Sequence, residues 1–143
     1  MPEIKFYSRI DNFTNNSFVN RLKEFDSVYF FSLEGIICRD QVEEAFRRSG
    51  INTGRRIKER GALFLCLLSG ERRIEEAILK SGLKSNTVKF GAIADSKDKI
   101  LALESTLTNE VEPLNFELKQ RCSKKELKIF TEMTMVDFYL QSN

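Results

Sequence analysis

The sequence predicts an α+β fold: a small mixed or mostly antiparallel sheet of roughly three to four strands, about five to seven helices, and a central buried helical hairpin. Some short stretches alternate apolar and polar residues, as strands do, and in others apolar residues recur every three or four positions, as in helices. The run Ala62–Leu68 is apolar at every position and supplies the hairpin. At 143 residues, the chain is expected to form a single domain over residues 1–143.

The hairpin is predicted from its apolar run and its glycines. An unbroken apolar run leaves no polar face at the helical or the strand period, so the segment Ile57–Leu68 is expected to be a helix buried on most sides. Gly70 stands where a left-handed residue ends a helix. The second arm, Arg72–Ser81, ends at Gly82 and is amphipathic, which places it on the surface. Its expected inward stripe is Ile74, Ala77, Ile78 and Ser81.

The N-terminal part predicts two strands and two helices. Residues 4–10 alternate with period two, as a half-buried strand does, and Phe18, Leu22 and Phe25 recur on one face of a helix. Residues 27–33 are apolar on both faces, so we expect a second, central strand there. Asp40 is the expected N-cap of a helix over residues 41–49, whose inward residues are Val42, Ala45 and Phe46.

The C-terminal part predicts a strand and two helices. Residues 87–94 form the third strand, in which Gly91 marks a point where something packs closely. Asp95 and Asp98 are expected to cap a helix over residues 96–107, and residues 110–120 are expected to be irregular. The Ser123–Glu126 capping box opens a C-terminal helix. Residues 133–140 of that helix carry more apolar surface than one core-facing stripe needs, so they are either core or a partner-binding patch.

The cysteines and the overall composition indicate a cytoplasmic protein. The three cysteines, Cys38, Cys66 and Cys122, are widely spaced and odd in number, which favours reduced packing residues over a disulfide or a zinc site. No apolar stretch approaches about 18 residues, and the first residues lack a signal-peptide pattern. Charged residues make up 31% of the chain, a share that leans toward a thermophilic origin.

The residues needed for most enzyme chemistry are missing. The sequence contains no histidine, which removes histidine-based nucleophilic systems and almost every transition-metal site. Its glycines do not follow a phosphate-binding or dinucleotide-binding pattern. Acidic pairs such as Glu43 with Glu44 and Glu75 with Glu76 fall on helix faces. We therefore expect a non-enzyme with no cofactor, no metal, no small-molecule substrate and no membrane partner.

Positive charge is concentrated around the hairpin. Residues 47–73 contain eight basic and two acidic residues, a local net charge of +6 that leaves −4 for the rest of the chain. Such a segregated charge favours an anionic partner, although a solvated charged face explains many such runs.

The stretch Leu65–Ile78, followed by Gly82, resembles the kinase-binding regulatory subunit family of the KEOPS tRNA-modification complex. The family pattern is an apolar helix ending in Leu-Ser-Gly, a charged pair, Gln or Arg, Ile, two variable residues and Ala-Ile, with Gly a few residues later. Gln41-Val42 and Ala45 occupy places where the family tends to have His-Leu and Ala. Phe64 stands where an acidic residue is frequent.

The resemblance implies a non-catalytic subunit. Members of this family contact the N-lobe of the small atypical kinase-like ATPase of KEOPS, stimulate it and help to bind tRNA, including the CCA end. The complex makes threonylcarbamoyl adenosine (t6A) beside the anticodon. On this basis the expected tRNA-binding residues are Arg55, Arg56, Lys58, Arg60, Arg72, Arg73, Ile74 and Leu83, the first six for phosphates and the last two for a splayed nucleobase. The expected kinase interface is Met133, Met135, Phe138, Tyr139 and Leu140.

Other interpretations stay open at this point. Arg72 and Arg73 would serve only their own helix if they paired with Glu75 and Glu76 at i, i+3 and i, i+4. A separate alternative is that the C-terminal apolar residues are plain core and not a kinase interface. A free-standing RNA-binding module needs the basic surface but no protein partner, and a pure protein adaptor needs only the apolar surface.

Overall fold

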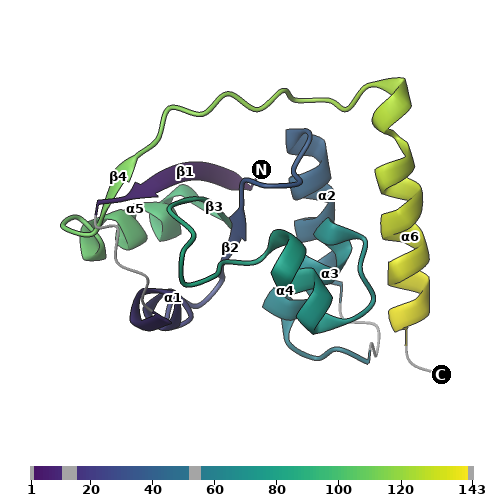
Figure 1. Cartoon of the computed structure of the whole chain (residues 1–143), viewed down its shortest axis with the longest axis horizontal. Coiled ribbons are helices and arrows are strands. Elements are labelled where there is room, and N and C mark those ends of the chain that lie inside the picture. The colour runs from purple at the N-terminus through teal and green to yellow at the C-terminus, as the bar shows by residue number, and fades with distance from the viewer. Residues whose placement is uncertain (1, 11–15, 52–55, 142–143) are drawn as a thin grey trace. The chain divides into compact units, whose positions relative to one another are not determined.

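The structure, a computed structural model, describes residues 2–10, 16–51 and 56–141 (Figure 1). The elements in chain order are β1 (Glu3–Arg9), α1 (Asn16–Leu22), β2 (Val28–Ser32), α2 (Arg39–Ser49), α3 (Arg60–Ser69), α4 (Ile74–Ser81), β3 (Lys89–Ala94), α5 (Lys97–Thr106), β4 (Val111–Pro113), the 3-10 turn η1 (Lys124–Glu126) and α6 (Lys128–Leu140).

The chain forms two compact units. The sheet unit comprises Met1–Leu33 with Leu83–Phe116, and the helical unit comprises Glu34–Gly82 with Glu117–Asn143. The predicted α+β class and the mostly antiparallel sheet are confirmed. The expectation of a single domain over residues 1–143 stays a prediction.

Among the described residues, four strands pair in one antiparallel sheet in the order β2-β3-β1-β4. Within the sheet unit the elements follow one another as β1-α1-β2 and then β3-α5-β4. This order, with β1 and β3 in the middle, is that of the ferredoxin-like, split βαβ motif. In the sequence, the residues of α2, α3 and α4 come between its two halves. Such a fold is shared by many unrelated functions and assigns none.

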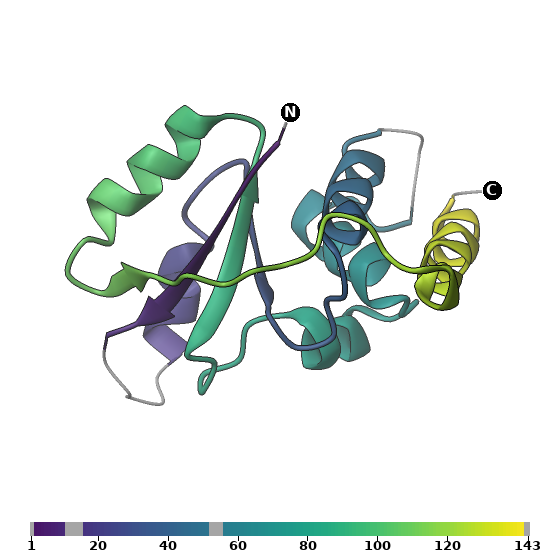
Figure 2. The same ribbon diagram turned by 90° about the horizontal axis from the view of Figure 1, so that it is seen from above.

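The core of the sheet unit lies between one face of the sheet and helices α1 and α5, which lie on the same side of it (Figure 2). Phe18 of α1 packs edge-on against Phe90, with ring centroids 5.9 Å apart, and Tyr7 packs beside Phe90 at 5.7 Å. The α5 residues Ile100 and Leu103 belong to the same cluster, and Leu107 joins it.

Strand β1 differs from its prediction because most of its expected polar face is buried, with only Lys5 exposed there. Tyr7 and Arg9, which stand at the polar positions of the alternation, are 2% and 5% exposed. The Tyr7 hydroxyl donates to Glu104 at 2.8 Å, and Arg9 donates to the Ser85 carbonyl at 3.0 Å with its guanidinium over Phe18. Long side chains with an apolar body can be buried where their polar ends find partners, which period-two reasoning does not reveal.

Two strand predictions need correction. Strand β2 lies at the edge of the sheet, not in its centre. Apolar residues on both faces of a strand show that both faces are covered, but they do not say that both hydrogen-bonding edges are paired. The short strand β4 falls in a stretch expected to be irregular; it pairs Val111 with Arg9 and Pro113 with Tyr7. Pro113 is compatible with this role because β4 is an edge strand.

Gly91 is where the sheet requires a glycine. It pairs with Phe31 on β2, and the Phe31 ring occupies the space that a Cβ at residue 91 would need. The prediction that something packs closely at Gly91 is confirmed, and the neighbour is the aromatic ring of its own cross-strand partner.

The hairpin prediction is confirmed for its central helix. In α3, Leu63, Phe64 and residues 66–69 are buried, and α3 packs against α2, α4 and α6. Gly70 has φ +75°, and the N–H groups of Gly70 and Glu71 both donate to the Cys66 carbonyl, which ends the helix. The boundaries differ by two or three residues, because α3 begins at Arg60 and α4 at Ile74.

The outer arm, α4, is more exposed than predicted. Ala77 and Ser81 are buried, but Ile74 and Ile78, expected to point inward, are 38% and 39% exposed. A helix of eight residues is too short for its pattern to define a wide inward face.

Two of the three predicted N-terminal caps are wrong. The N-cap of α2 is Cys38, not Asp40, and the first N–H groups of α2 donate to carbonyls of another segment: Arg39 to Lys119 and Asp40 to Gln120. The N-cap of α5 is Ser96. Asp95 instead forms an ion pair with Lys99. The Ser123–Glu126 capping box is confirmed.

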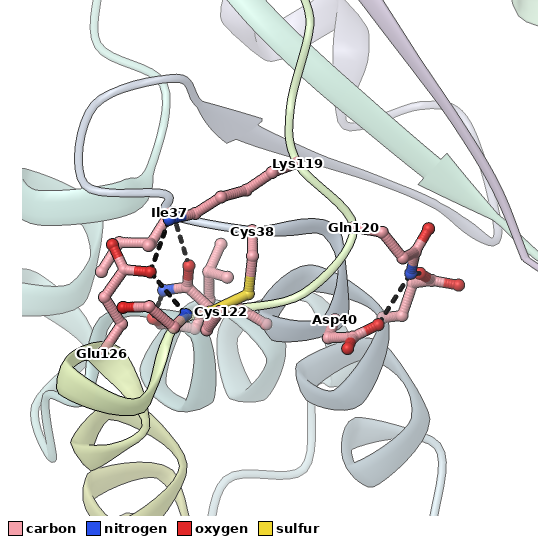
Figure 3. Close-up of a disulfide and its surroundings, with 11 residues drawn as sticks. Ile37, Cys38, Asp40, Lys119, Gln120, Cys122 and Glu126 are labelled. Carbon is pink, nitrogen blue, oxygen red and sulfur yellow. Dashed lines mark hydrogen bonds and ion pairs between the residues drawn. A yellow bond between two sulfur atoms is a disulfide. The ribbon is translucent and has the colours of Figure 1, made fainter.

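The prediction that Cys38 and Cys122 are reduced is wrong, because they form a disulfide with Cα atoms 5.3 Å apart (Figure 3). The cysteines are 84 residues apart in sequence, so spacing did not reveal the pair. They meet because residues 119 and 120 run beside the start of α2 and bond its amides. Cys66 is free and buried, as expected.

Gln41 connects α2 to the hairpin. Its side chain is 3% exposed, accepts a hydrogen bond from the Ile37 N–H at 2.8 Å and donates to the Leu68 carbonyl at 3.2 Å. The Ile37 N–H needs an acceptor and the Leu68 carbonyl needs a donor, so only a side chain that offers both suits this position.

Within the described ranges, no helix is both long enough and apolar enough to span a bilayer.

Candidate binding surface on the helical unit

Two arginines from different segments lie over one aromatic ring of α6. The guanidinium carbon of Arg72 is 4.7 Å from the centroid of the Tyr139 ring, and that of Arg56 is 5.1 Å away. Arg72 precedes α4 and Arg56 precedes α3, so the contact joins the basic hairpin region to the C-terminal helix. A guanidinium at this distance is attracted by the negative face of the ring.

The local backbone places both arginines near the C-terminal end of α6. The Arg56 N–H donates to the carbonyl of Leu140, the last residue of α6, at 2.8 Å. Gly70 turns the chain sharply at the end of α3, and two residues later Arg72 reaches Tyr139. The end of a helix carries partial negative charge on its free carbonyls, which favours cations there. No carboxylate of the described part of the chain forms an ion pair with Arg56 or Arg72.

Arg60 serves the interior of the helical unit. Its Nε donates to Ser49 Oγ at 3.1 Å and an Nη donates to the Phe46 carbonyl at 3.0 Å, with the guanidinium 4.2 Å from the Phe46 ring. Phe46 and Ser49 lie in the last turn of α2, so Arg60 satisfies a carbonyl at the end of that helix. A guanidinium engaged in this way has less freedom to reach a phosphate than the exposed cations of the set.

The other basic residues of the predicted tRNA set are exposed or undescribed. Lys58 and Arg73 are exposed, and Arg55 lies outside the described residues. Arg73 approaches Glu76 at 4.0 Å, an exposed i, i+3 pair of the kind that contributes little. Of the alternative in which Arg72 and Arg73 pair only within α4, the structure shows one long contact, from Arg73 to Glu76. Arg72 contacts Tyr139 of α6 instead.

The two apolar residues of the tRNA set lie in different units. Ile74 begins α4 in the helical unit and is 38% exposed. Leu83 belongs to the sheet unit, where it is partly buried against the core cluster with Phe25 and Phe30. Packing of Leu83 reduces the surface that it offers to a nucleobase.

The five residues of the predicted kinase interface divide into two sets. Met133 and Leu140 are buried with Val136 and form the inward stripe of α6. Met135, Phe138 and Tyr139 are exposed, Phe138 at 78%. Both sequence interpretations of this helix thus apply to part of it: Met133 and Leu140 are core, and the other three form a separate apolar surface.

Sequence reasoning missed the residue that attaches α6 to α2. Arg48 donates to Thr134 Oγ1 at 2.9 Å and lies within 4.0 Å of Asp137 and 3.4 Å of Glu44. The hydrogen bond from Arg47 to Glu44, with help from Arg48, lowers the pKa of Glu44. An acidic residue three and four positions before a basic pair was the only local signal for this network.

The free cysteine, Cys66, lacks the properties of a reactive thiol. Burial is the main cause that raises the pKa of the Cys66 thiol to about 11, and the nearby Glu71 and Glu75 add to it. A thiol with such a pKa has very little thiolate near neutral pH, and the thiolate is the reactive form.

No family model matches the chain, and a search of curated proteins finds no significant similarity. The KEOPS resemblance therefore rests on the residues that carry it, from Leu65 to Gly82.

Proposed function

We propose that this protein is a non-catalytic subunit of a KEOPS complex that binds and stimulates the small atypical kinase/ATPase of that complex and helps to bind tRNA, including its CCA end, for t6A modification. The motif Leu65–Gly82 supports this proposal. The observation that carries it further is the contact of Arg56 and Arg72 with Tyr139, because it puts guanidinium groups beside the exposed apolar residues of α6.

The proposal divides the work between two kinds of side chain. Lys58 and Arg73 are exposed cations with no strong partner among the described residues, and they would neutralise phosphates. Ile74 would contact a base of a single-stranded end. Met135 and Phe138 would contact the kinase, since exposed aromatic and methionine side chains are enriched at the centres of protein interfaces.

The proposed compartment is the cytoplasm, where a tRNA-modifying complex works. Disulfides are rare in that compartment, with intracellular proteins of hyperthermophiles as the main exception. The Cys38–Cys122 disulfide and the 31% charged residues fit such an origin together.

The test is a reconstitution with the KEOPS kinase subunit and with tRNA that either ends in CCA or lacks it. We expect the protein to raise the ATPase rate of the kinase, to have no ATPase activity by itself, and to bind the complete tRNA more tightly than the shortened one. A kinase rate that does not change, together with no binding of either tRNA, would overturn the proposal.

The same experiment separates the other two function classes. A free-standing RNA-binding module would bind tRNA but leave the kinase rate unchanged, and its tRNA affinity would survive Phe138→Glu. A pure protein adaptor would stimulate the kinase but bind neither tRNA, and it would keep all of its activity when Lys58 and Arg73 are changed to Glu. The internal role of Arg60 is the observation that favours the adaptor, because it removes one cation from the expected phosphate-binding set.

A further inference from the structure

We propose that the exposed face of α6 docks on a protein surface with a specific chemistry: an apolar hollow that receives Phe138, bordered by carboxylates that pair with Arg56 and Arg72. The inference rests on the proposed function, because its probe is the KEOPS kinase subunit. It goes further by naming the side chains of this protein that contact the partner and the groups that receive them.

The first step is that α6 has two apolar faces and its own core uses one. The inward stripe of Met133, Val136 and Leu140 is buried. Met135, Phe138 and Tyr139, spaced i, i+3 and i+4, lie together on a different face and are 54%, 78% and 43% exposed. Phe138 is the most exposed of the large apolar residues described. A phenylalanine ring with so much surface in water is a natural anchor for a partner's pocket.

The second step concerns the charge at the edge of this face. Arg56 and Arg72 lie over the Tyr139 ring, and no ion pair with a carboxylate of the described chain engages either of them. The nearest acidic residue along the helix, Asp137, lies beside Arg48 on α2. Two cations bordering an exposed aromatic side chain complement a partner that carries negative charge around an apolar centre.

The third step decides between a protein and a nucleic acid at this face. α6 carries one basic residue, Lys128, and it lies at the opposite end of the helix from Tyr139. Met135 and Phe138 contribute most of the exposed surface and offer nothing to a phosphate. The Tyr139 ring already has guanidinium groups over it, so a base could stack there only by displacing them. These observations favour a protein.

The experiment measures the affinity of the recombinant kinase subunit for the full chain at several salt concentrations. The variants are Phe138→Ala, Arg72→Glu, Arg72→Lys and Arg56→Glu. Lys128→Glu is the matched control, because Lys128 is an exposed cation of the same helix that lies at the opposite end from Tyr139. Circular dichroism and the midpoint of thermal unfolding are recorded for each variant, so that a folding defect is not mistaken for a binding defect.

We expect Phe138→Ala to weaken kinase binding about tenfold or more, as truncation of a central anchor does. Arg72→Glu and Arg56→Glu should weaken it and flatten its salt dependence, whereas Arg72→Lys should retain part of the affinity because the charge remains. Lys128→Glu should bind the kinase like the unaltered chain. Changing a kinase carboxylate to lysine should restore binding to the Arg72→Glu variant.

Different failures give different results. If the unaltered chain does not bind the kinase, the proposed function is overturned and the docking inference with it. If the chain binds but Phe138→Ala and Arg72→Glu behave like the Lys128→Glu control, only the docking inference is overturned. The same holds if these two variants lose tRNA binding and keep kinase binding, since the face would then belong to RNA.

Discussion

A disulfide joins Cys38, the N-cap residue of α2, to Cys122, which lies one residue before the capping box that opens η1. On the same stretch, Lys119 and Gln120 accept hydrogen bonds from the first two amides of α2, and the Gln120 amide donates to Asp40 at 2.7 Å (Figure 3). The covalent bond and the backbone bonds thus hold the C-terminal arm, and α6 with it, against the start of α2.

Reduction of this disulfide should destabilise the helical unit. For a loop of 84 residues, the chain-entropy relation predicts a loss of about 4 to 5 kcal/mol. Denaturant unfolding with and without a reductant, and of the Cys38→Ser/Cys122→Ser variant, measures it. Mass spectrometry after alkylation of the denatured, unreduced protein should find one modified cysteine, Cys66. Three modified cysteines would contradict the pairing.

Gly91→Ala should destabilise the sheet by about 1 to 3 kcal/mol or more, because its methyl group would overlap the Phe31 ring. Phe31→Leu makes room at the same point, so the double variant should lose less than the sum of the two single losses. Denaturant midpoints of the four proteins form the cycle. Strict additivity would mean that the ring is not the obstacle.

Gln41→Leu should lower the free energy of unfolding by about 1 to 3 kcal/mol, because it leaves the Ile37 N–H and the Leu68 carbonyl without their partner. Gln41→His should lose less, since a neutral imidazole offers one acceptor and one donor. Histidine is also the residue that the KEOPS resemblance places at this position. Equal losses for the two variants would show that the hydrogen bonds are not what matters at this site.

Changing Arg60 should affect the stability of the fold, whereas changing Lys58 should affect tRNA binding. Arg60→Ala removes the donor to the Phe46 carbonyl, and we expect it to cost about 1 to 2 kcal/mol of stability. Lys58→Ala should leave stability unchanged and flatten the plot of log tRNA affinity against log salt by roughly 0.7 to 0.9 if Lys58 contacts a phosphate. A slope that does not change for Lys58→Ala would remove it from the tRNA-binding set.

Acid should loosen the capping box of η1. The hydrogen bond from Lys119, followed by the one from the Ser123 N–H, lowers the pKa of Glu126 from 4.5 to about 2. A carboxyl whose folded pKa is depressed contributes stability at pH values above the unfolded pKa, and this contribution is lost as the pH falls from about 4.5 toward 2. Glu126→Gln should flatten the stability profile within that window and lower the stability above pH 5 by a constant amount, because the variant lacks the charged carboxylate that contributes there. A profile identical to that of the unaltered protein would contradict the assignment.

The parts of the fold that were predicted correctly depend on near neighbours in the sequence. The run Ala62–Leu68 has no polar face, so it had to be buried wherever the rest of the chain went. The hydrogen bonds that Gly70 and the Ser123–Glu126 box make to end or begin a helix span no more than four residues of the chain. Gly91 was recognised as a close approach, but the ring that approaches it comes from residue 31.

The candidate site was predicted in part for the same reason. Composition and the motif at Leu65–Gly82 pointed to the basic hairpin and the apolar C-terminal helix. Which arginine faces outward depends on neighbours that pattern reasoning does not see. Arg60 bonds the end of α2, while Arg72 and Arg56 meet on Tyr139.

By itself, the sequence determined the α+β class, the buried hairpin with its left-handed glycine, and the glycine contact in the third strand, because short-range periodicity and backbone geometry decide these. The tertiary structure alone decided that β2 lies at the edge, that Cys38 bonds Cys122 and that Phe138 stays exposed while Met133 is buried. Each of these depends on which distant segments pack together, and the free energy of that packing is a sum over partners that no local pattern contains.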